Sequence, residues 1–123
     1  MQEGKRQKQV AAVLEEALND IFRRIGLNMM HGGMVSISSV KITPDLYEAR
    51  VYISFYKIAD TAAALKQIQE RAWEIKKELT QRVRHQLRTM PVLSFFIDDT
   101  LEYVDHIEKI FKEIKEGEDK KIG

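Results

Sequence analysis

The sequence predicts a small α+β domain in which helices cover one face of a three-stranded sheet, in the order α-β-β-α-α-β-α. Three observations point to this class: long segments with apolar residues at helical spacing, two alternating segments on either side of a Pro-Asp turn, and an apolar run after Pro91. With 123 residues and 44% apolar side chains, the chain can bury one core. We therefore expect a single domain over residues 1–123, with residues 117–123 as a flexible tail.

The first element is a helix over residues of about 5 to 25, where apolar side chains from Val10 to Ile25 recur every three or four positions. Gly26 stands where a helix commonly ends, because glycine readily adopts the left-handed conformation that closes the last turn. Residues 28–33 ("NMMHGG") then interrupt the periodicity and predict a flexible connector.

A β-hairpin is predicted next. Residues 35–43 and 49–56 alternate apolar and polar side chains, as half-buried strands do, and Pro44 marks the turn between them. The apolar phase of the first strand slips near Ser38 and Ser39, which predicts a β-bulge.

The second half of the chain predicts a long helix, a strand and a last helix. Helical spacing is unbroken from 61 to 88, but a straight helix of that length would measure about 42 Å, against a radius of gyration of about 14 Å for such a domain. We therefore expect the helix to be bent or broken. Pro91 ends it, and residues 92–98 are apolar on both faces, which predicts a central or well-covered strand before a helix over 101–114.

Two adjacent aspartates follow that strand and raise the question of a metal or catalytic site. Asp99 stands three residues before Glu102, the pattern of a capping box at the start of a helix. A metal site would need further oxygen or nitrogen ligands, and no loop of them is recognisable. Capping is the favoured interpretation, and an enzyme that holds a divalent ion at Asp98 and Asp99 stays open as the alternative.

Other catalytic chemistry finds little support. The chain has no cysteine, and His31, His85 and His106 share no ligand spacing, so we predict no catalytic residue, no metal and no cofactor. No apolar run approaches the roughly 20 residues needed to span a bilayer, and the polar, basic start is unlike a secretory leader. We expect a cytoplasmic monomer without a membrane partner or a small-molecule substrate.

The net charge of +1 conceals an uneven distribution. Residues 61–97 carry 7 basic and 3 acidic side chains (net +4), whereas residues 98–123 carry 5 and 9 (net −4). Such asymmetry indicates an interaction surface.

The helical periodicity predicts on which side of the long helix its basic side chains lie. Trp73, Lys77, Gln81, Arg84 and Arg88 fall within about 40° of one line, opposite the apolar face. Arginine and lysine neutralise phosphates, and an aromatic ring beside them can stack an unpaired base. From spacing alone, a solvated helical face and a nucleic-acid surface both remain open.

A KH-like module is one fold with these elements. KH domains clamp a nucleic-acid backbone through a GxxG loop. This chain has no glycine between Gly33 and Gly117, so that grip is absent.

Three segments together resemble bacterial ribosome-binding factor A: "KRQKQVAAVLEEALNDIF", "MVSISSVKITPDLYEARVYISFY" and "LRTMPVLSFFIDDTLEY". The likeness covers the chain from about Lys5 to Phe111. It implies a KH-like fold of the second type and a non-enzymatic factor that binds the immature small (30S) ribosomal subunit near the ends of its 16S rRNA. Such a factor supports late folding and 5′-end processing, and it is associated with growth at low temperature. The expected partners are small-subunit rRNA and free small subunits.

The resemblance places RNA binding on the basic helices. The predicted RNA-binding residues are Trp73, Lys76, Lys77, Arg82, Arg84 and Arg88, together with Lys5, Arg6 and Lys8 near the start of the chain. Arg23 and Arg24 either extend this surface or solvate the first helix.

This chain departs from the family pattern at two places. Family members carry an alanine-x-glycine kink between the two inner helices, and the corresponding residues here read Arg71-Ala72-Trp73. In addition, the segment between Leu79 and Pro91 is about two residues longer than the family pattern. Trp73 then either contacts RNA or wedges the bend from inside. Two other functions stay open: a protein-interaction module that uses the acidic C-terminal helix, and a general binder of single-stranded RNA.

Overall fold

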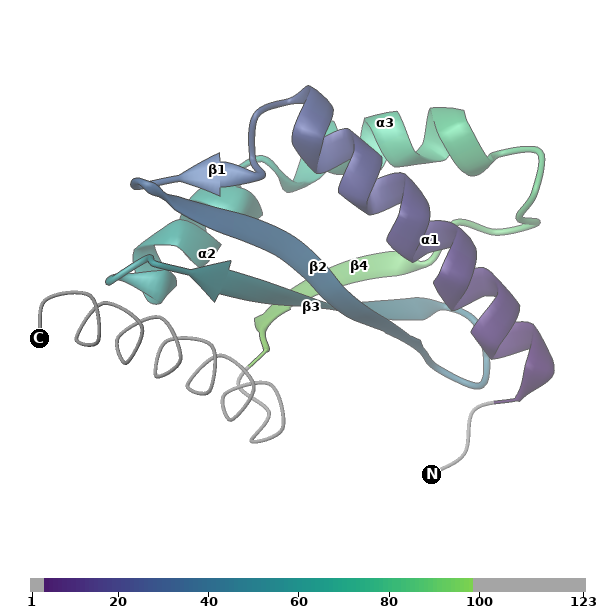
Figure 1. The fold of residues 1–123 in the computed structure, drawn as a ribbon. Coiled ribbons are helices and arrows are strands. Elements are labelled where there is room, and N and C mark those ends of the chain that lie inside the picture. Colours follow the sequence, from purple (N-terminus) through teal and green to yellow (C-terminus); the bar gives the residue numbers. More distant parts are fainter. Residues whose placement is uncertain (1–3, 99–123) are drawn as a thin grey trace, which may run out of the picture.

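The computed structural model describes residues 4–98, in which α1 and α3 lie side by side over one face of a mixed sheet (Figure 1). The α+β class is confirmed, and α1 and α3 cover one face of the sheet as predicted. The last predicted helix, the proposed cap at Asp99 and Glu102, and the tail lie outside the described residues. The elements in chain order are α1 (Lys5–Arg24), β1 (Met29–Met30), β2 (Gly33–Ile42), β3 (Glu48–Tyr56), α2 (Thr61–Glu70), α3 (Ala72–Val83) and β4 (Val92–Ile97).

Helix α1 begins and ends where its periodicity predicts. Gly26 follows the helix with φ 80, the left-handed conformation that glycine adopts without steric cost. The backbone N–H of Leu27 then donates to the carbonyl of Phe22 at 2.8 Å, which satisfies one of the last free carbonyls. Leu14 and Leu18 on its inner face are fully buried against the sheet.

A short strand, β1, was missed by the sequence analysis. Met30 pairs with Gly33, and the two residues between them, His31 and Gly32, have φ of 51 and 78. Positive φ at both loop positions is what a type I′ hairpin turn requires. The prediction of a flexible connector is therefore wrong, and the described sheet has four strands in the order β1-β2-β3-β4 instead of three.

The hairpin of β2 and β3 carries the predicted bulge. The register between the two strands shifts between Ile37 and Ser39. The backbone N–H of Ile37 is satisfied by the side-chain oxygen of Asn19 on α1 at 3.1 Å, and the hydroxyl of Ser38 donates to the carbonyl of Tyr52 at 3.1 Å. The bulge is thus tied both to the helix above it and to the neighbouring strand.

Strand β4 is present, but the prediction of a central position is wrong. Within residues 4–98, β4 lies at the end of the sheet and pairs in parallel with β3. Its side chains Val92 and Phe96 are 64% and 41% exposed, whereas Phe95 is buried. Apolar residues on both faces of a strand do not show which strands lie beside it, so this pattern could not predict that β4 lies at the end of the described sheet. The parallel pairing follows from the long return of the chain through α2 and α3.

The long helix predicted over 61–88 is broken, as its length required. The break falls at Arg71, with φ −102 and ψ 16, between α2 and α3. The prediction that helix continues to residue 88 is wrong, because α3 ends at Val83 and the chain turns back toward Pro91.

Gly33 stands where β2 approaches the end of β3 too closely for any side chain. A Cβ atom there would lie 2.2 Å from the backbone oxygen of Tyr56 and 2.6 Å from the Cγ1 atom of Ile58. We expect Gly33→Ala to lower the free energy of unfolding by about 1–3 kcal/mol, since backbone must move to relieve the overlap. Met34→Ala, at the next and 59% exposed position, is the control and should change it by less than about 0.5 kcal/mol. Urea unfolding measures both, and equal stability of the two variants would contradict the prediction.

Candidate nucleic-acid interface

Helix α3 has an inner and an outer face. Ile75, Leu79 and Val83 are buried in the core, at the spacing of one helical face. The opposite face is exposed to solvent. We define the α3 stripe as four exposed residues of α3, Trp73, Lys76, Lys77 and Gln81, together with Arg84, which directly follows the helix.

Trp73 points away from the core. It is 71% exposed, in the first turn of α3, so the alternative in which it wedges the bend from inside is wrong. Lys76 and Lys77 lie three and four residues further on, and therefore on the same side of the helix. An aromatic ring and two ammonium groups thus share one rigid surface.

The bend before Trp73 is held by Arg71, whose role the sequence analysis missed. The Arg71 guanidinium donates to the carboxylate of Glu74 at 2.9 and 3.1 Å and to the backbone oxygen of Ile25 at 3.2 Å. The hydrogen bond from Arg71 lowers the pKa of Glu74 and raises the pKa of Arg71 itself. The hydrogen bond to Ile25 ties the start of α3 to the end of α1. The three-residue spacing of Arg71 and Glu74 was the feature of the sequence that could have predicted their ion pair.

Several of the arginines singled out from the sequence form ion pairs with carboxylates of the same chain. Arg82 lies 3.8 Å from the carboxylate of Asp20, and Arg24 lies 3.0 Å from that of Glu78. Arg23 pairs with Asp20 as well, so Arg23 and Arg24 do not extend a free basic surface. By contrast, four cations between residues 76 and 88 form no ion pair with any described residue: Lys76, Lys77, Arg84 and Arg88.

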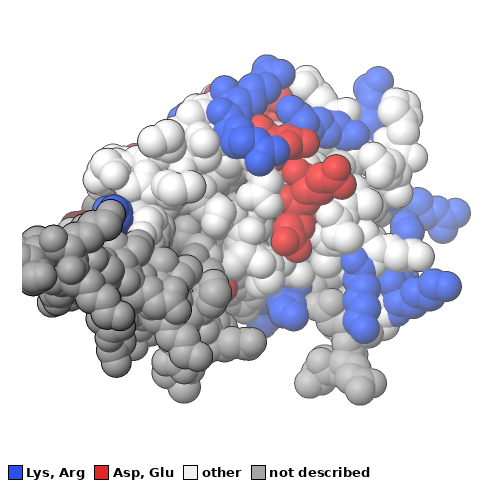
Figure 2. Space-filling model, viewed as in Figure 1, with Lys and Arg blue, Asp and Glu red and all other residues white. Residues whose placement is uncertain are grey.

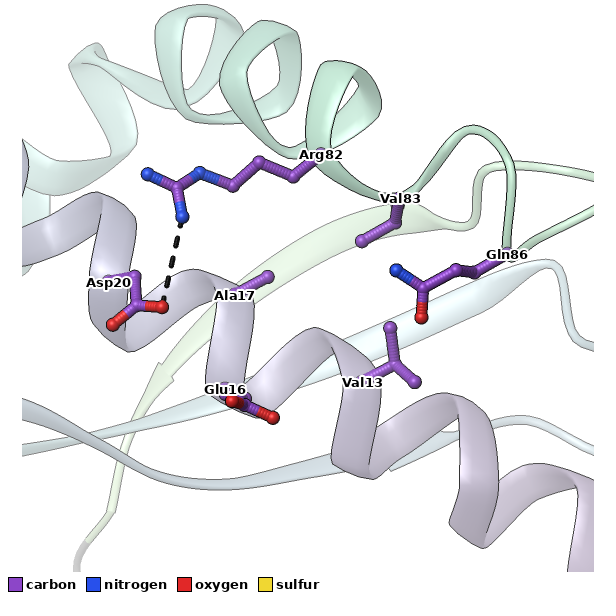
Figure 3. A pocket seen from close by; sticks show the side chains of 7 residues that line it. All are labelled: Val13, Glu16, Ala17, Asp20, Arg82, Val83 and Gln86. Atoms are coloured by element: carbon purple, nitrogen blue, oxygen red, sulfur yellow. Dashed lines mark ion pairs between the residues drawn. The ribbon is translucent and has the colours of Figure 1, made fainter.

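A groove runs between α1 and α3, with a volume of about 350 Å³ (Figure 3). The carboxylates of Glu16 and Asp20 lie along its α1 side, and Arg82 crosses to Asp20. Carboxylates repel phosphate oxygens, so this groove does not suit an RNA backbone.

Basic residues at the start of α1 lie near the end of the loop that follows α3. Arg6 and Arg88 line one hollow of about 440 Å³, although they are 82 positions apart in the chain. Arg88 therefore lies beyond the α3 stripe, and its predicted alignment with Trp73 is wrong because α3 ends first. Lys5 and Lys8 are exposed on the first turns of α1.

Tyr47 is a surface aromatic that the sequence analysis did not single out. It is 64% exposed and lines the same hollow as Arg6 and Arg88. The only feature of the sequence that could have predicted its exposure is its position in a polar turn, directly before a strand. We call this space the Tyr47 hollow; it is lined by Arg6, Val10, Asp45, Leu46, Tyr47, Leu87, Arg88, Thr89 and Pro91.

Figure 2 shows how these charges are distributed on the face that carries α1. Acidic side chains lie in the centre, between one basic group at the upper edge and others at the right. The sequence of α1 has the same pattern, with basic residues at both ends and Glu15, Glu16 and Asp20 between them. Acidic side chains thus divide the basic surface on this face.

Other kinds of site find no support among residues 4–98. No three histidine, aspartate or glutamate side chains in that range come together as metal ligands would. His31 contacts Gln67 at 3.2 Å, and His85 accepts from Arg84 at 3.2 Å. No helix in that range has the length and apolar character needed to cross a bilayer.

Known protein sequences match this chain along most of its length. The family model for ribosome-binding factor A matches residues 6–111. The factor from Christiangramia forsetii is 42% identical over 113 residues, which cover 91% of this chain and 86% of the relative. That from Flavobacterium psychrophilum is 39% identical over 107 residues, covering 86% and 82%.

Solved structures show the same fold at lower identity. The crystal structure of ribosome-binding factor A from Thermus thermophilus superposes with a TM-score of 0.61 at 18% identity, over 74% of this chain and 94% of that one. The solution structure of a Thermotoga maritima protein gives 0.64 at 17% identity, over 83% and 95%. A homology model of the Thermus thermophilus factor, fitted into a cryo-EM map of a 30S complex with that factor, gives a TM-score of 0.55 at 20% identity, over 70% of this chain and 88% of that one.

Proposed function

Because the chain belongs to the ribosome-binding factor A family, we propose that it binds the immature 30S subunit and its rRNA through the α3 stripe and Arg88. It is a non-enzymatic maturation factor, which acts by binding. One observation carries the choice of surface: Lys76, Lys77, Arg84 and Arg88 are exposed and have no anionic partner among the described residues.

A polyanion explains this arrangement better than solvation alone. Like charges on one face of a helix repel one another, and phosphates remove that repulsion while counterions leave the RNA. Arg82 is engaged by Asp20 and therefore contributes less. Trp73 adds a ring on which an unpaired base can stack.

The start of α1 supports the same conclusion. Lys5, Arg6 and Lys8 lie in the first turns of the helix, where the helix dipole disfavours cations by roughly 0.3–1 kcal/mol each. No described acidic residue occupies the first turn to offset this cost. Phosphate groups placed near these residues would interact favourably with both the side chains and the helix end.

The proposed mechanism needs no chemical step. A rigid helix with fixed cations holds bound rRNA in one arrangement, and this biases the folding of neighbouring rRNA toward the form that late processing of the 5′ end requires. Its place of action is the cytoplasm, where small subunits mature.

Sucrose-gradient fractionation of cell extract tests this function. We expect the protein to sediment with free 30S subunits and to be absent from translating ribosomes. Treatment of the extract with about 0.5 M salt should release the protein, because the contacts are electrostatic. A general binder of single-stranded RNA would spread over all ribosomal fractions, and a module for another protein partner would leave the 30S peak empty; either distribution would contradict the proposal.

A further inference from the structure

We infer that the Tyr47 hollow binds one unpaired nucleotide of a single-stranded RNA, with its base on Tyr47 and its phosphate at Arg6 and Arg88. This inference rests on the proposed RNA-binding function and adds a specific subsite to it. The α3 stripe lies on a different element from Tyr47.

The lining of the hollow suits a flat heterocycle with a charged group. Its floor is apolar, made by Val10, Leu46, Leu87 and Pro91, of which Val10 and Pro91 are buried. The other lining residues are polar: two arginines, the exposed tyrosine, Asp45 and Thr89. An apolar floor with a few convergent polar groups, in a volume of about 440 Å³, is typical of sites for small ligands.

Three segments that are distant in the chain are fixed around the hollow. The side-chain amide of Gln7 donates to the carbonyl of Ile42 at 2.7 Å, which ties the start of α1 to the end of β2. The backbone N–H of Val92 donates to the carbonyl of Tyr47 at 2.7 Å, which ties the turn after β2 to the start of β4. The hollow is therefore formed before any ligand arrives, and binding costs little ordering of the backbone.

The turn that carries Tyr47 is itself rigid. The carboxylate of Asp45 accepts from the hydroxyl of Thr43 at 2.6 Å and from the backbone N–H of Tyr47 at 3.0 Å. These hydrogen bonds hold the pKa of Asp45 below its ordinary value, so the carboxylate stays charged. Leu46 follows with φ 65, a conformation that a leucine adopts only where its surroundings impose it.

The charged residues that line the hollow indicate where the phosphate and the base of the nucleotide lie. Arg6 and Arg88 form no ion pair with described residues and are free to contact phosphate oxygens. The charged Asp45 repels phosphate and accepts N–H groups, which bases present along their edges. The phosphate therefore lies on the arginine side and the base edge faces the turn.

The ligand must be unpaired. An aromatic side chain stacks a base only when a face of that base is free, and in a duplex both faces are covered by neighbouring base pairs. A duplex reaches the two arginines through its phosphates alone.

The experiment compares Tyr47→Leu with Tyr47→Phe in the full chain, using fluorescence anisotropy. The probes are the RNA strand 5′-CACACACA, the same strand with abasic residues throughout, and a blunt RNA duplex. We expect Tyr47→Leu to weaken binding of the CA strand by about 5- to 150-fold, the effect of losing one stacked base. Tyr47→Phe should bind it as the wild type does, and Tyr47→Leu should leave the abasic strand and the duplex unchanged. Thermal unfolding controls for the fold, which an exposed side chain affects little.

The results that would contradict this subsite differ from the result that would contradict the proposed function. If wild-type protein does not bind the CA strand, if Tyr47→Leu binds it as tightly as wild type does, or if Tyr47→Phe is as weak as Tyr47→Leu, no stacked nucleotide occupies the hollow. Equal weakening on the abasic strand or the duplex overturns the inference as well. In each case the protein can still sediment with 30S subunits, whereas absence from the 30S peak counts against the function itself.

Discussion

Replacing Lys76, Lys77, Arg84 and Arg88 together by glutamine is expected to weaken binding to 30S subunits by about 100- to 1000-fold at about 0.15 M salt. Each phosphate contact contributes roughly 0.7–0.9 to the slope of log K against log salt, so four contacts contribute roughly 3. The variant should therefore show a salt dependence that is flatter by roughly 3 slope units. The measurement is binding to purified 30S subunits between about 0.05 and 0.3 M salt.

The chain offers a control with the same change of charge. Arg23, Arg24, Arg50 and Arg82 each lie against a carboxylate in the described structure. Replacing these four by glutamine removes as much positive charge, but from groups that are already paired. We expect the salt slope to change by less than about 1 unit, because few phosphate contacts are lost. If the control weakens 30S binding as much as the first variant does, net charge and not the α3 stripe determines affinity.

Leu79→Ala is expected to give the largest loss of stability among the changes considered. Leu79 is fully buried on the inner face of α3, opposite the stripe, in the core shared with α1 and the sheet. Removing a buried leucine side chain costs about 2–5 kcal/mol through lost burial and the cavity left behind. The free energy of unfolding of a domain of this kind is about 5–15 kcal/mol, so the variant loses a substantial part of its stability.

Urea unfolding followed by circular dichroism measures this change. Gln81→Ala, at an exposed position two residues further along the same helix, is the control and should stay within about 0.5 kcal/mol of the wild type. A loss below about 1 kcal/mol for Leu79→Ala would show that α3 packs on the sheet less closely than its burial indicates.

Local pattern predicted most elements of this fold, although it missed the short strand β1 and extended the long helix beyond Val83. The three- and four-residue spacing predicted α1 and both faces of α3, and the slip at Ser38 predicted the bulge. The length of the 61–88 segment alone required the break that falls at Arg71. Each of these features depends on residues within a few positions of one another or on the size of the whole chain.

Contacts between residues that are far apart in the chain could not be predicted from these local patterns. The sequence analysis treated Arg82 and Arg84 alike, but Arg82 forms an ion pair with Asp20, which lies on a helix 62 positions earlier. The strand after Pro91 was recognisable, yet its place at the end of the described sheet depends on how α2 and α3 return the chain.

The class of fold, the family and a basic helix with an apolar inner face follow from the residues and their spacing. Which cations are free, and which aromatic lies beside them, depends on contacts between distant elements. Arg6, Tyr47 and Arg88 meet only once α1, the hairpin turn and the loop after α3 have packed together. Helical and strand periodicity describe the direction of a side chain relative to its own element. The neighbours of that side chain are set by hydrogen bonds and packing between elements, such as the bond from Gln7 to Ile42.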